Sequence, residues 1–189
     1  MIEIYGQIEN DLLSKDELVN VNYRCGYNSP MGLLDSGTRS FKYRSSLNPV
    51  LLKRRENEED FYNFLKSQLL LRLQEIKFYS NVNVMDTRRL VSVSPDCISM
   101  IQIIIREQIN LIVHFRSSDF NGALPADLEF ISRIPYELIQ HLNKFKGEPG
   151  YDEVNDEIIN ILYDMPVNVS ISFGSVHKIW LYCIDKTMR

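Results

Sequence analysis

Cys97 begins a short stretch in which several groups that can do chemistry lie close together in the sequence. An Arg-Ser-Ser-Asp run occupies positions 116–119, and a Gly-Ala-Leu-Pro-Ala-Asp run occupies positions 122–127. The thiolate form of a cysteine is a nucleophile, and a nearby cation favours that form. A guanidinium also offers two parallel donors to phosphate oxygens. The stretch therefore gathers a nucleophile, a cation, hydroxyls and two carboxylates, the groups from which active sites are built.

Two apolar runs predict where these groups lie in the fold. Residues 98–105 and 109–115 are rich in β-branched side chains, and a polar break at residues 106–108 separates them. This pattern predicts a hairpin of two well-buried strands. Cys97 then lies at the start of the first strand and residues 116–119 at the end of the second. Strand ends and loops are common places for functional sites.

Helices and further strands are predicted after the hairpin. Residues 126–143 have apolar side chains on more than one helical face, which predicts a deeply buried helix with a kink at Pro135. A second helix is predicted over residues 152–163. Strands are predicted over residues 167–173 and 176–184, with a turn or bulge at Gly174-Ser175 between them.

Before the hairpin the sequence predicts one clear helix, over residues 57–76, with Asn57 as its N-cap, and a strand over residues 88–94. The remaining expectations are weaker in pattern. Ile2, Ile4 and Ile8 are consistent with the start of a strand. After them the sequence predicts a short helix over residues 11–21, a turn-rich loop over residues 23–36 and a basic connector over residues 37–57. The alternative for the connector is a loop that touches an anionic ligand.

This mixed order of helices and strands predicts one α+β domain over residues 1–189, with helices on a largely antiparallel or mixed sheet. The net charge of −4 does not suggest a nucleic-acid-binding surface, and no apolar run is long enough to span a membrane. The N-terminus lacks the features of a signal peptide. Only three cysteines occur, so we expect free thiols, no disulfide framework, no metal site and a cytoplasmic location.

Several motifs resemble the thymidylate synthase and deoxycytidylate hydroxymethylase superfamily, and the short archaeal-type synthases in particular. Cys97 is followed by Gln102, and Phe-Arg-Ser-Ser-Asp at 115–119 precedes Gly-Ala-Leu-Pro-Ala-Asp-Leu at 122–128. Asp-Thr-Arg-Arg at 86–89 lies upstream, and Ser-Phe-Gly-Ser-Val-His at 172–177 lies downstream. Several motifs that occur in the same order as in the family are far stronger evidence of a resemblance than Arg-Ser-x-Asp alone, which can arise by chance. The resemblance covers roughly residues 86–180, half of the chain.

The resemblance implies a thymidylate synthase-like fold and a homodimer in which two sheets pack back to back. It implies a folate-dependent transfer of one carbon to C5 of a pyrimidine nucleoside monophosphate, by hydroxymethylation or methylation. The donor is then 5,10-methylenetetrahydrofolate. Cys97 matches the nucleophile, whose thiolate adds to C6 of the base and makes C5 able to attack the donor. A simpler interpretation of Cys97 is a buried, inert cysteine.

The same resemblance assigns roles to further residues. Arg116 and Ser117 match phosphate ligands, and Arg88 and Arg89 match an arginine pair that the partner subunit lends to the phosphate. The simpler interpretation is that these arginines are solvated. Two other matched residues are Asp119, which orients the folate and an ordered water, and His177, which contacts the deoxyribose hydroxyl. Asp119 could instead cap its own loop, and His177 could be a structural core histidine.

Asp127 bears on the choice of base. Thymidylate synthases carry asparagine at this point, and deoxycytidylate hydroxymethylases carry aspartate. A protonated aspartic acid can accept from the amino group of cytosine and donate to N3. The resemblance therefore favours dCMP over dUMP as the substrate. A helix N-cap is the simpler interpretation of Asp127, and both roles can hold at once.

Some positions depart from the family pattern. Met31 stands before Gly32 where the family has tyrosine, Asp96 replaces a proline beside the thiol, and Ile179 replaces a tyrosine. The N-terminal family segment that carries a catalytic glutamate is not recognised. These departures favour an alternative to the enzyme, namely a non-enzymatic homologue that keeps the fold, with or without nucleotide binding.

Overall fold

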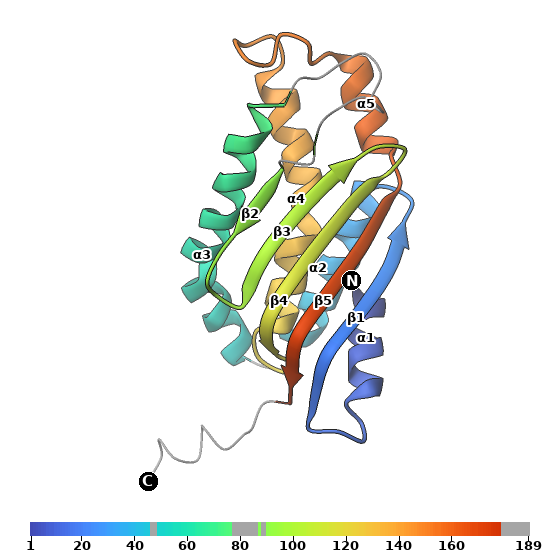
Figure 1. Cartoon of the computed structure of the whole chain (residues 1–189), viewed down its shortest axis with the longest axis vertical. Helices are drawn as coiled ribbons and strands as arrows, with labels where there is room; N and C mark the ends of the chain where they lie inside the picture. The colour runs from blue at the N-terminus through green and yellow to red at the C-terminus, as the bar shows by residue number, and fades with distance from the viewer. Residues whose placement is uncertain (46–48, 77–86, 88–89, 179–189) are drawn as a thin grey trace.

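A five-stranded sheet forms the centre of the fold (Figure 1). Its strand order is β1-β5-β4-β3-β2. Neighbouring strands are antiparallel except β4 and β5, which are parallel, so the sheet is mixed. A parallel pair needs a crossover connection, and the chain supplies one through two helices. The strands are β1 Glu17–Tyr27, β2 Val91–Val93, β3 Ile98–Ile105, β4 Ile109–Asp119 and β5 Val167–His177.

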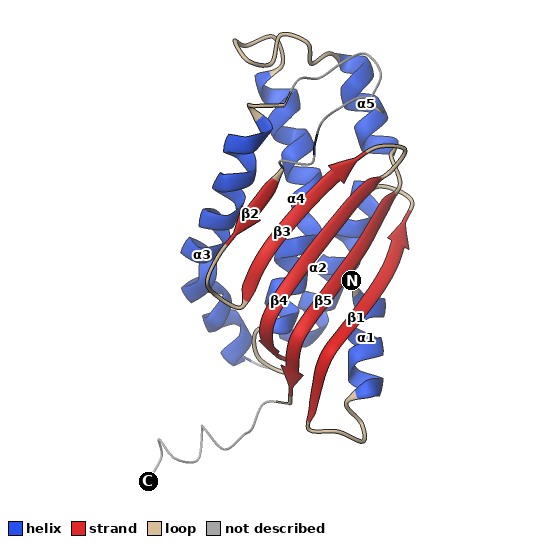
Figure 2. Cartoon of the chain, viewed as in Figure 1, coloured by secondary structure: helices blue, strands red, loops and turns tan. Residues whose placement is uncertain are grey.

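The structure is a computed structural model that describes residues 1–45, 49–76, 87 and 90–178. Within these residues the helices lie behind the sheet in the view of Figure 2, and the front face of the sheet carries no helix. The fold is therefore α+β, as the sequence predicts. The helices are α1 Ile2–Asp11, α2 Pro30–Ser45, α3 Pro49–Leu73, α4 Leu124–Phe145 and α5 Asp156–Asp164.

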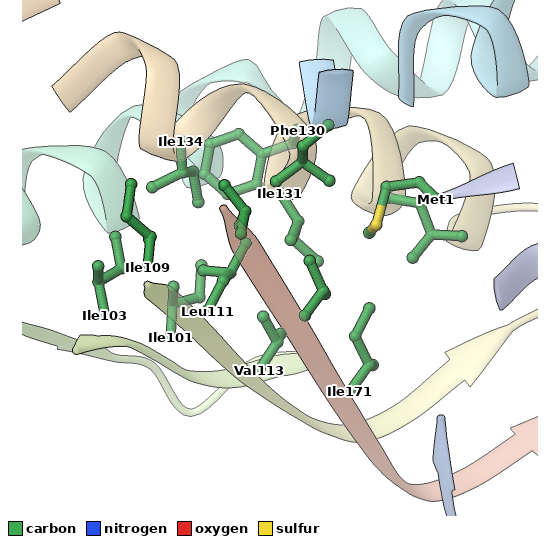
Figure 3. Packing of buried hydrophobic residues seen from close by; sticks show 14 of the residues in the cluster. Met1, Ile101, Ile103, Ile109, Leu111, Val113, Phe130, Ile131, Ile134 and Ile171 are labelled. Atoms are coloured by element: carbon green, nitrogen blue, oxygen red, sulfur yellow. The ribbon is translucent and has the colours of Figure 1, made fainter. Parts of the chain in front are cut away.

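The hydrophobic core lies between α4 and the back face of the sheet (Figure 3). Strand β4 alternates between buried and more exposed side chains, as expected of a strand with one covered face. Its buried residues meet the apolar side chains of α4, including Ile131 and Ile134. Full burial of one such side chain stabilises the fold by roughly 1.5–3 kcal/mol. The predicted hairpin and the deeply buried helix are both confirmed, and Pro135 lies inside α4.

The N-terminal predictions are wrong in type. Residues 2–11 form helix α1 and not a strand, because Ile4 and Ile8 have the four-residue spacing of one helical face. Residues 17–21 of the predicted helix 11–21 belong instead to strand β1, in which Tyr23 and Cys25 alternate with exposed neighbours. The predicted loop 23–36 holds the end of β1 and the beginning of α2.

The basic connector predicted over residues 37–57 is also wrong, because its described residues belong to α2 and α3. Helix α3 begins at Pro49 and not after Asn57. Proline is common in the first helical turn, where its missing N–H costs no hydrogen bond. The helix therefore starts at a proline within the segment predicted to be a connector.

The C-terminal half differs from the predictions only in detail. Helix α5 begins at Asp156 and not at residue 152, because Asn155 is its N-cap and its side chain accepts from the N–H of Ile158 at 3.0 Å. Strand β5 continues through Gly174-Ser175 without a turn and reaches His177. The rest of the predicted strand 176–184 lies outside the described residues, apart from Lys178. None of the described helices is both long and apolar enough to cross a bilayer.

Candidate functional site

Cys97 and Arg116 are neighbours at one end of the sheet. The hairpin pairs Ile98 with Phe115, and the backbone N–H of Arg116 donates to the carbonyl of Cys97 at 2.8 Å. The thiol-bearing and guanidinium-bearing residues therefore lie side by side at the ends of adjacent strands, although the 18 residues 98–115 separate them in sequence. The apolar alternation of the two strands fixes this register, since a shift by one residue would turn the core side chains to solvent.

Strand β5 brings another predicted residue, His177, to the same end. The parallel pairing sets Ser117 beside Ser175 and Asp119 beside His177. The N–H of Phe120 donates to the carbonyl of His177 at 3.0 Å, which continues this contact past the end of β4. Figure 1 shows that β4 and β5 end, and β3 and α4 begin, at this same end of the molecule.

Gly174 allows β4 and β5 to approach each other beside Arg116. A Cβ at position 174 would lie 2.5 Å from the carbonyl oxygen of Arg116, closer than real Cβ atoms come. A larger residue would therefore push the strands apart at the level of the candidate site. The predicted turn at Gly174 is absent, and its glycine is explained by this close approach.

Asp119 does cap its own loop, as the simpler interpretation predicts. Its Oδ1 accepts from the backbone N–H of Gly122 at 3.2 Å. This bond holds the short loop that joins β4 to α4. A carboxylate has about four acceptor positions, so this bond does not exclude a ligand at Asp119.

Asp127 is buried in the first turn of α4, and only 2% of it is exposed. Ala123, and not Asp127, is the N-cap of α4, so the N-cap interpretation is wrong. The Asp127 carboxylate meets α3 instead, where the Tyr62 hydroxyl donates to its Oδ1 at 2.8 Å. The Tyr62 ring also stacks on Phe130, with the ring centres 4.4 Å apart. Tyr62 is not among the predicted site residues, because it precedes Asp127 by 65 positions and belongs to no motif.

The two described cysteines have different surroundings. Cys25 is buried in β1, and this burial raises the pKa of its thiol to about 11. Its Sγ donates to the Tyr27 hydroxyl at 3.3 Å. Cys97 is half-buried and lies at a strand end next to Arg116. Because Cys97 is less buried than Cys25, it is the better placed of the two to act as a nucleophile.

Two of the residues that depart from the family pattern, Asp96 and Met31, lie within the described part of the chain. The Asp96 carboxylate next to the thiol accepts from the hydroxyl of Ser94 at 3.1 Å, so it is held within its own turn. Met31 lies in the first turn of α2 and is 43% exposed. Three matched or departing residues, Arg88, Arg89 and Ile179, lie outside the described residues.

A groove of about 760 Å³ between α3 and β2 lies away from the strand end and is lined by Gln68, Leu71 and Val93, among others. A smaller hollow of about 240 Å³ on the front face of the sheet borders the strand end, because its lining includes Phe115 and Gly174. No cluster of three or more His, Cys, Asp or Glu side chains suited to a metal ion occurs in the parts of the chain that the structure describes.

No protein-family model matches the chain, and a search of curated proteins finds no match. The motifs of this chain and the geometry of its strand end are therefore the observations that bear on its function.

Proposed function

We propose that the chain has a thymidylate synthase-like fold and transfers one carbon from a folate to C5 of a pyrimidine nucleoside monophosphate, with dCMP as the favoured substrate. The observation that carries this proposal is the hydrogen bond from the Arg116 N–H to the Cys97 carbonyl, at 2.8 Å. It sets the residue that bears the proposed nucleophile beside a residue that bears a cation, at the end of the sheet that also holds Asp119 and His177. Residues that the motifs link only in sequence are thus neighbours in space.

Cys97 acts as the nucleophile in this proposal. Its thiolate forms a bond to C6 of the base, and the electron pair of the C5–C6 double bond moves to C5 and into the ring. C5 can then attack an electrophilic carbon, which an isolated pyrimidine does poorly. The Arg116 side chain favours the thiolate over the thiol if it lies close to the sulfur. After C5 has lost its proton, expulsion of the thiolate from C6 restores the double bond and frees the product.

The one-carbon unit comes from 5,10-methylenetetrahydrofolate when this cofactor is bound. Asp119 is the residue we propose to hold it, because a carboxylate suits the N–H groups of a pterin. Its Oδ1 accepts from Gly122, and a carboxylate has about four acceptor positions in all. Hydroxymethylation requires a water molecule to reach the new carbon, whereas methylation requires its exclusion in favour of hydride.

Phosphate and sugar recognition belong to other residues of the strand end. Arg116 and Ser117 supply a guanidinium and a hydroxyl to the phosphate, and His177 contacts the deoxyribose hydroxyl. Arg88 and Arg89 of one subunit reach the phosphate in the other, so that each site needs both chains. The front face of the sheet, which carries no described helix, is the surface through which we propose that two chains pair.

Asp127 is the residue that we propose selects the base. As a neutral acid it can pair with both N3 and the amino group of cytosine, whereas uracil would bring O4 against a carboxyl oxygen. An unpaired buried polar group costs roughly 1–3 kcal/mol, which corresponds to about 5- to 150-fold in binding. Because Asp127 is only 2% exposed, a base reaches it only after the side chains that cover it move.

A covalent adduct tests the enzyme proposal. The protein is incubated with 5-fluoro-dCMP and 5,10-methylenetetrahydrofolate, and its intact mass is measured. Fluorine cannot leave C5 as a cation, so an adduct at C6 should accumulate on Cys97. Cys97→Ser should abolish the adduct, and the matched control Cys25→Ser should retain it, since the Cys25 thiol has a raised pKa. Absence of any adduct on the wild-type chain would contradict the enzyme proposal.

A second candidate is a non-enzymatic homologue that binds the nucleotide or only keeps the fold. The burial of Asp127 and its bond to Tyr62 favour this candidate, because both give the carboxylate a structural role. Calorimetry separates the two candidates. Binding of dCMP without adduct formation supports a nucleotide-binding homologue, and absence of both supports a purely structural one.

A further inference from the structure

Tyr62 holds one oxygen of the Asp127 carboxyl group. Its hydroxyl donates to Oδ1 at 2.8 Å in a buried setting between α3 and α4. The phenol ring is itself fixed, because it is 5% exposed and stacks on Phe130 at a ring-centre distance of 4.4 Å and an angle of 16°. The donor therefore has little freedom to leave Oδ1.

We propose that Tyr62 is a positioning residue that makes Asp127 selective for cytosine, an inference that rests on the proposed function. The two oxygens of a carboxyl group are chemically equivalent until their surroundings differ. A neutral acid carries its proton on one of them, and a proton on Oδ1 would oppose the Tyr62 hydroxyl donor. Tyr62 therefore directs the proton to Oδ2 and keeps Oδ1 as an acceptor.

This arrangement matches the edge of cytosine. Oδ2–H donates to N3, which has a lone pair in cytosine and a hydrogen in uracil. Oδ1 has two acceptor positions, so it can accept from Tyr62 and from the cytosine amino group at the same time. The hydrogen bond also prevents rotation of the carboxyl plane, which would exchange the two oxygens. Without the hydroxyl, the acid should lose part of its preference for cytosine.

Calorimetric titration with dCMP and dUMP tests the inference. The ratio of the two dissociation constants is measured for the wild type, Tyr62→Phe, Asp127→Asn and the double variant. Phenylalanine keeps the stack on Phe130 and removes only the donor. We expect Tyr62→Phe to reduce the preference for dCMP about 3- to 10-fold, the worth of one hydrogen bond. Tyr62→Phe should not change the ratio in the Asp127→Asn background, because Tyr62 acts through the carboxyl group.

Tyr5 provides a matched control. Its ring is also buried and stacked, on Phe120 at 4.4 Å, and its hydroxyl donates to a backbone carbonyl at 3.5 Å. Tyr5→Phe should therefore lower stability without changing the ratio. If Tyr62→Phe does not fold, 3-fluorotyrosine at position 62 replaces it. This analogue is a stronger donor of similar size and should increase the preference for dCMP.

The outcomes separate the two proposals. A wild-type chain that binds neither nucleotide overturns the proposed function, and the inference falls with it. If both nucleotides bind and removal or strengthening of the Tyr62 donor leaves their ratio unchanged, Tyr62 only supports the fold, and the inference is wrong while the proposed function stands. A change in the ratio that persists in the Asp127→Asn background also overturns it, since Tyr62 would then act by another route.

Discussion

At the scale of single residues, the candidate site is a set of polar groups at the ends of buried strands. Arg116 follows four alternating core residues of β4, so its backbone is held by the sheet and its exposed side chain is left for a ligand. The same applies to Ser117 and Asp119, whose positions are fixed by pairing with β5. Such residues can be replaced with little loss of core packing, which makes them good targets for tests of function.

Arg116→Ala should weaken the binding of dCMP and leave the binding of deoxycytidine unchanged. A hydrogen bond to a charged group contributes about 1.5–3 kcal/mol, so the loss should be about 10- to 150-fold. Calorimetry with the nucleotide and the nucleoside measures both. The control is Arg72→Ala, which removes an arginine that pairs with Glu75 on the surface of α3. Equal effects on nucleotide and nucleoside would remove the phosphate role from Arg116.

Sequence patterns predict correctly that several candidate residues lie at strand ends; their roles stay predictions. Cys97, Arg116, Asp119 and His177 all reach one end of the sheet, because the strands that carry them have clear apolar patterns. Tyr62 could not be predicted in this way. Its spacing fits an ordinary helical core stripe, and its role depends on how α3 packs against α4, which no local pattern encodes.

At the scale of elements, α2 and α4 are in close contact through one glycine. A Cβ at Gly37 would overlap the side chain of Ser132 on α4. Ser132 is fully buried and its hydroxyl donates to the carbonyl of Glu129 at 2.7 Å, so it cannot easily turn away. Helix α4 also carries Asp127 and packs on the back of the core. The contact between Gly37 and Ser132 therefore helps to fix the position of α4, and with it the position of Asp127.

Gly37→Ala should therefore destabilise the protein, although alanine is the better helix former. Overpacking costs typically 1–3 kcal/mol, and the gain in helix propensity is about 1 kcal/mol. Because the overlap with Ser132 is severe, we expect a net loss of up to about 2 kcal/mol in the free energy of unfolding, measured by urea denaturation. Gly6→Ala in α1 is the control, because a Cβ there meets nothing within 4 Å and should stabilise the protein. Ser132→Gly should recover part of the loss in the Gly37→Ala background.

The C-terminal part of α4 contains a histidine whose protonation opposes folding. Burial, with a smaller effect of Lys144, lowers the pKa of His141 below its usual value near 6.5. Its Nε2 lies 3.1 Å from the Tyr151 hydroxyl. Below that usual pKa the unfolded chain takes up a proton that the folded chain resists. The contribution of neutral His141 is therefore present above about pH 6.5 and is lost as the pH falls through the lowered pKa.

His141→Gln should reduce the acid sensitivity of the fold. The melting temperature of the wild type should fall more between pH 7.5 and pH 5.5 than that of the variant, and circular dichroism measures both. Lys144→Gln should give an intermediate dependence, because it removes the second cause of the lowered pKa. Parallel pH profiles for the wild type and His141→Gln would show that His141 does not contribute.

The elements themselves differ in how far their sequences determine them. The hairpin and α4 are predicted because their apolar residues dominate and keep one period. Helix α1 and strand β1 are not, because short segments with few apolar residues fit either period. Their type is decided by packing, as Ile4 and Ile8 of α1 and Leu18 of β1 all join the core. Helix α3 begins at Pro49 although residues 53–60, after its first apolar turn, are all charged or polar.

At the scale of the whole molecule, the sheet has one face covered by helices and one without them (Figure 2). Even-numbered residues of β4 point to the front face, since its odd-numbered residues up to Phe115 are in the core. Ile112 and His114 lie there, and His114 contacts Ser172 of β5. A solvated sheet face is usually polar. Ile112 and Ile104 of β3, both partly buried, give this otherwise largely polar face two apolar side chains that could contact a second copy.

We expect the chain to form a homodimer through this face, with each site shared by two subunits. Light scattering at micromolar concentration should report a dimer for the wild type. Ile112→Lys should shift it to monomer, because the pairing of two identical faces buries the new charge in both copies. Ile161→Lys on α5 is the matched control, since Ile161 is 38% exposed and lies away from the sheet face. A wild-type monomer would contradict the shared site.

Mixing of inactive variants tests the sharing directly. Cys97→Ser lacks the nucleophile, and the Arg88→Ala/Arg89→Ala variant lacks the arginines proposed to act across the dimer. Alone, neither should form the adduct with 5-fluoro-dCMP. In a mixed dimer, one site combines an intact Cys97 with intact arginines from the partner, so refolding the two together should restore about a quarter of the sites. Arginines that act within their own subunit would restore none. The addition of Ile112→Lys to both variants should abolish the recovery, because the two chains could then no longer pair.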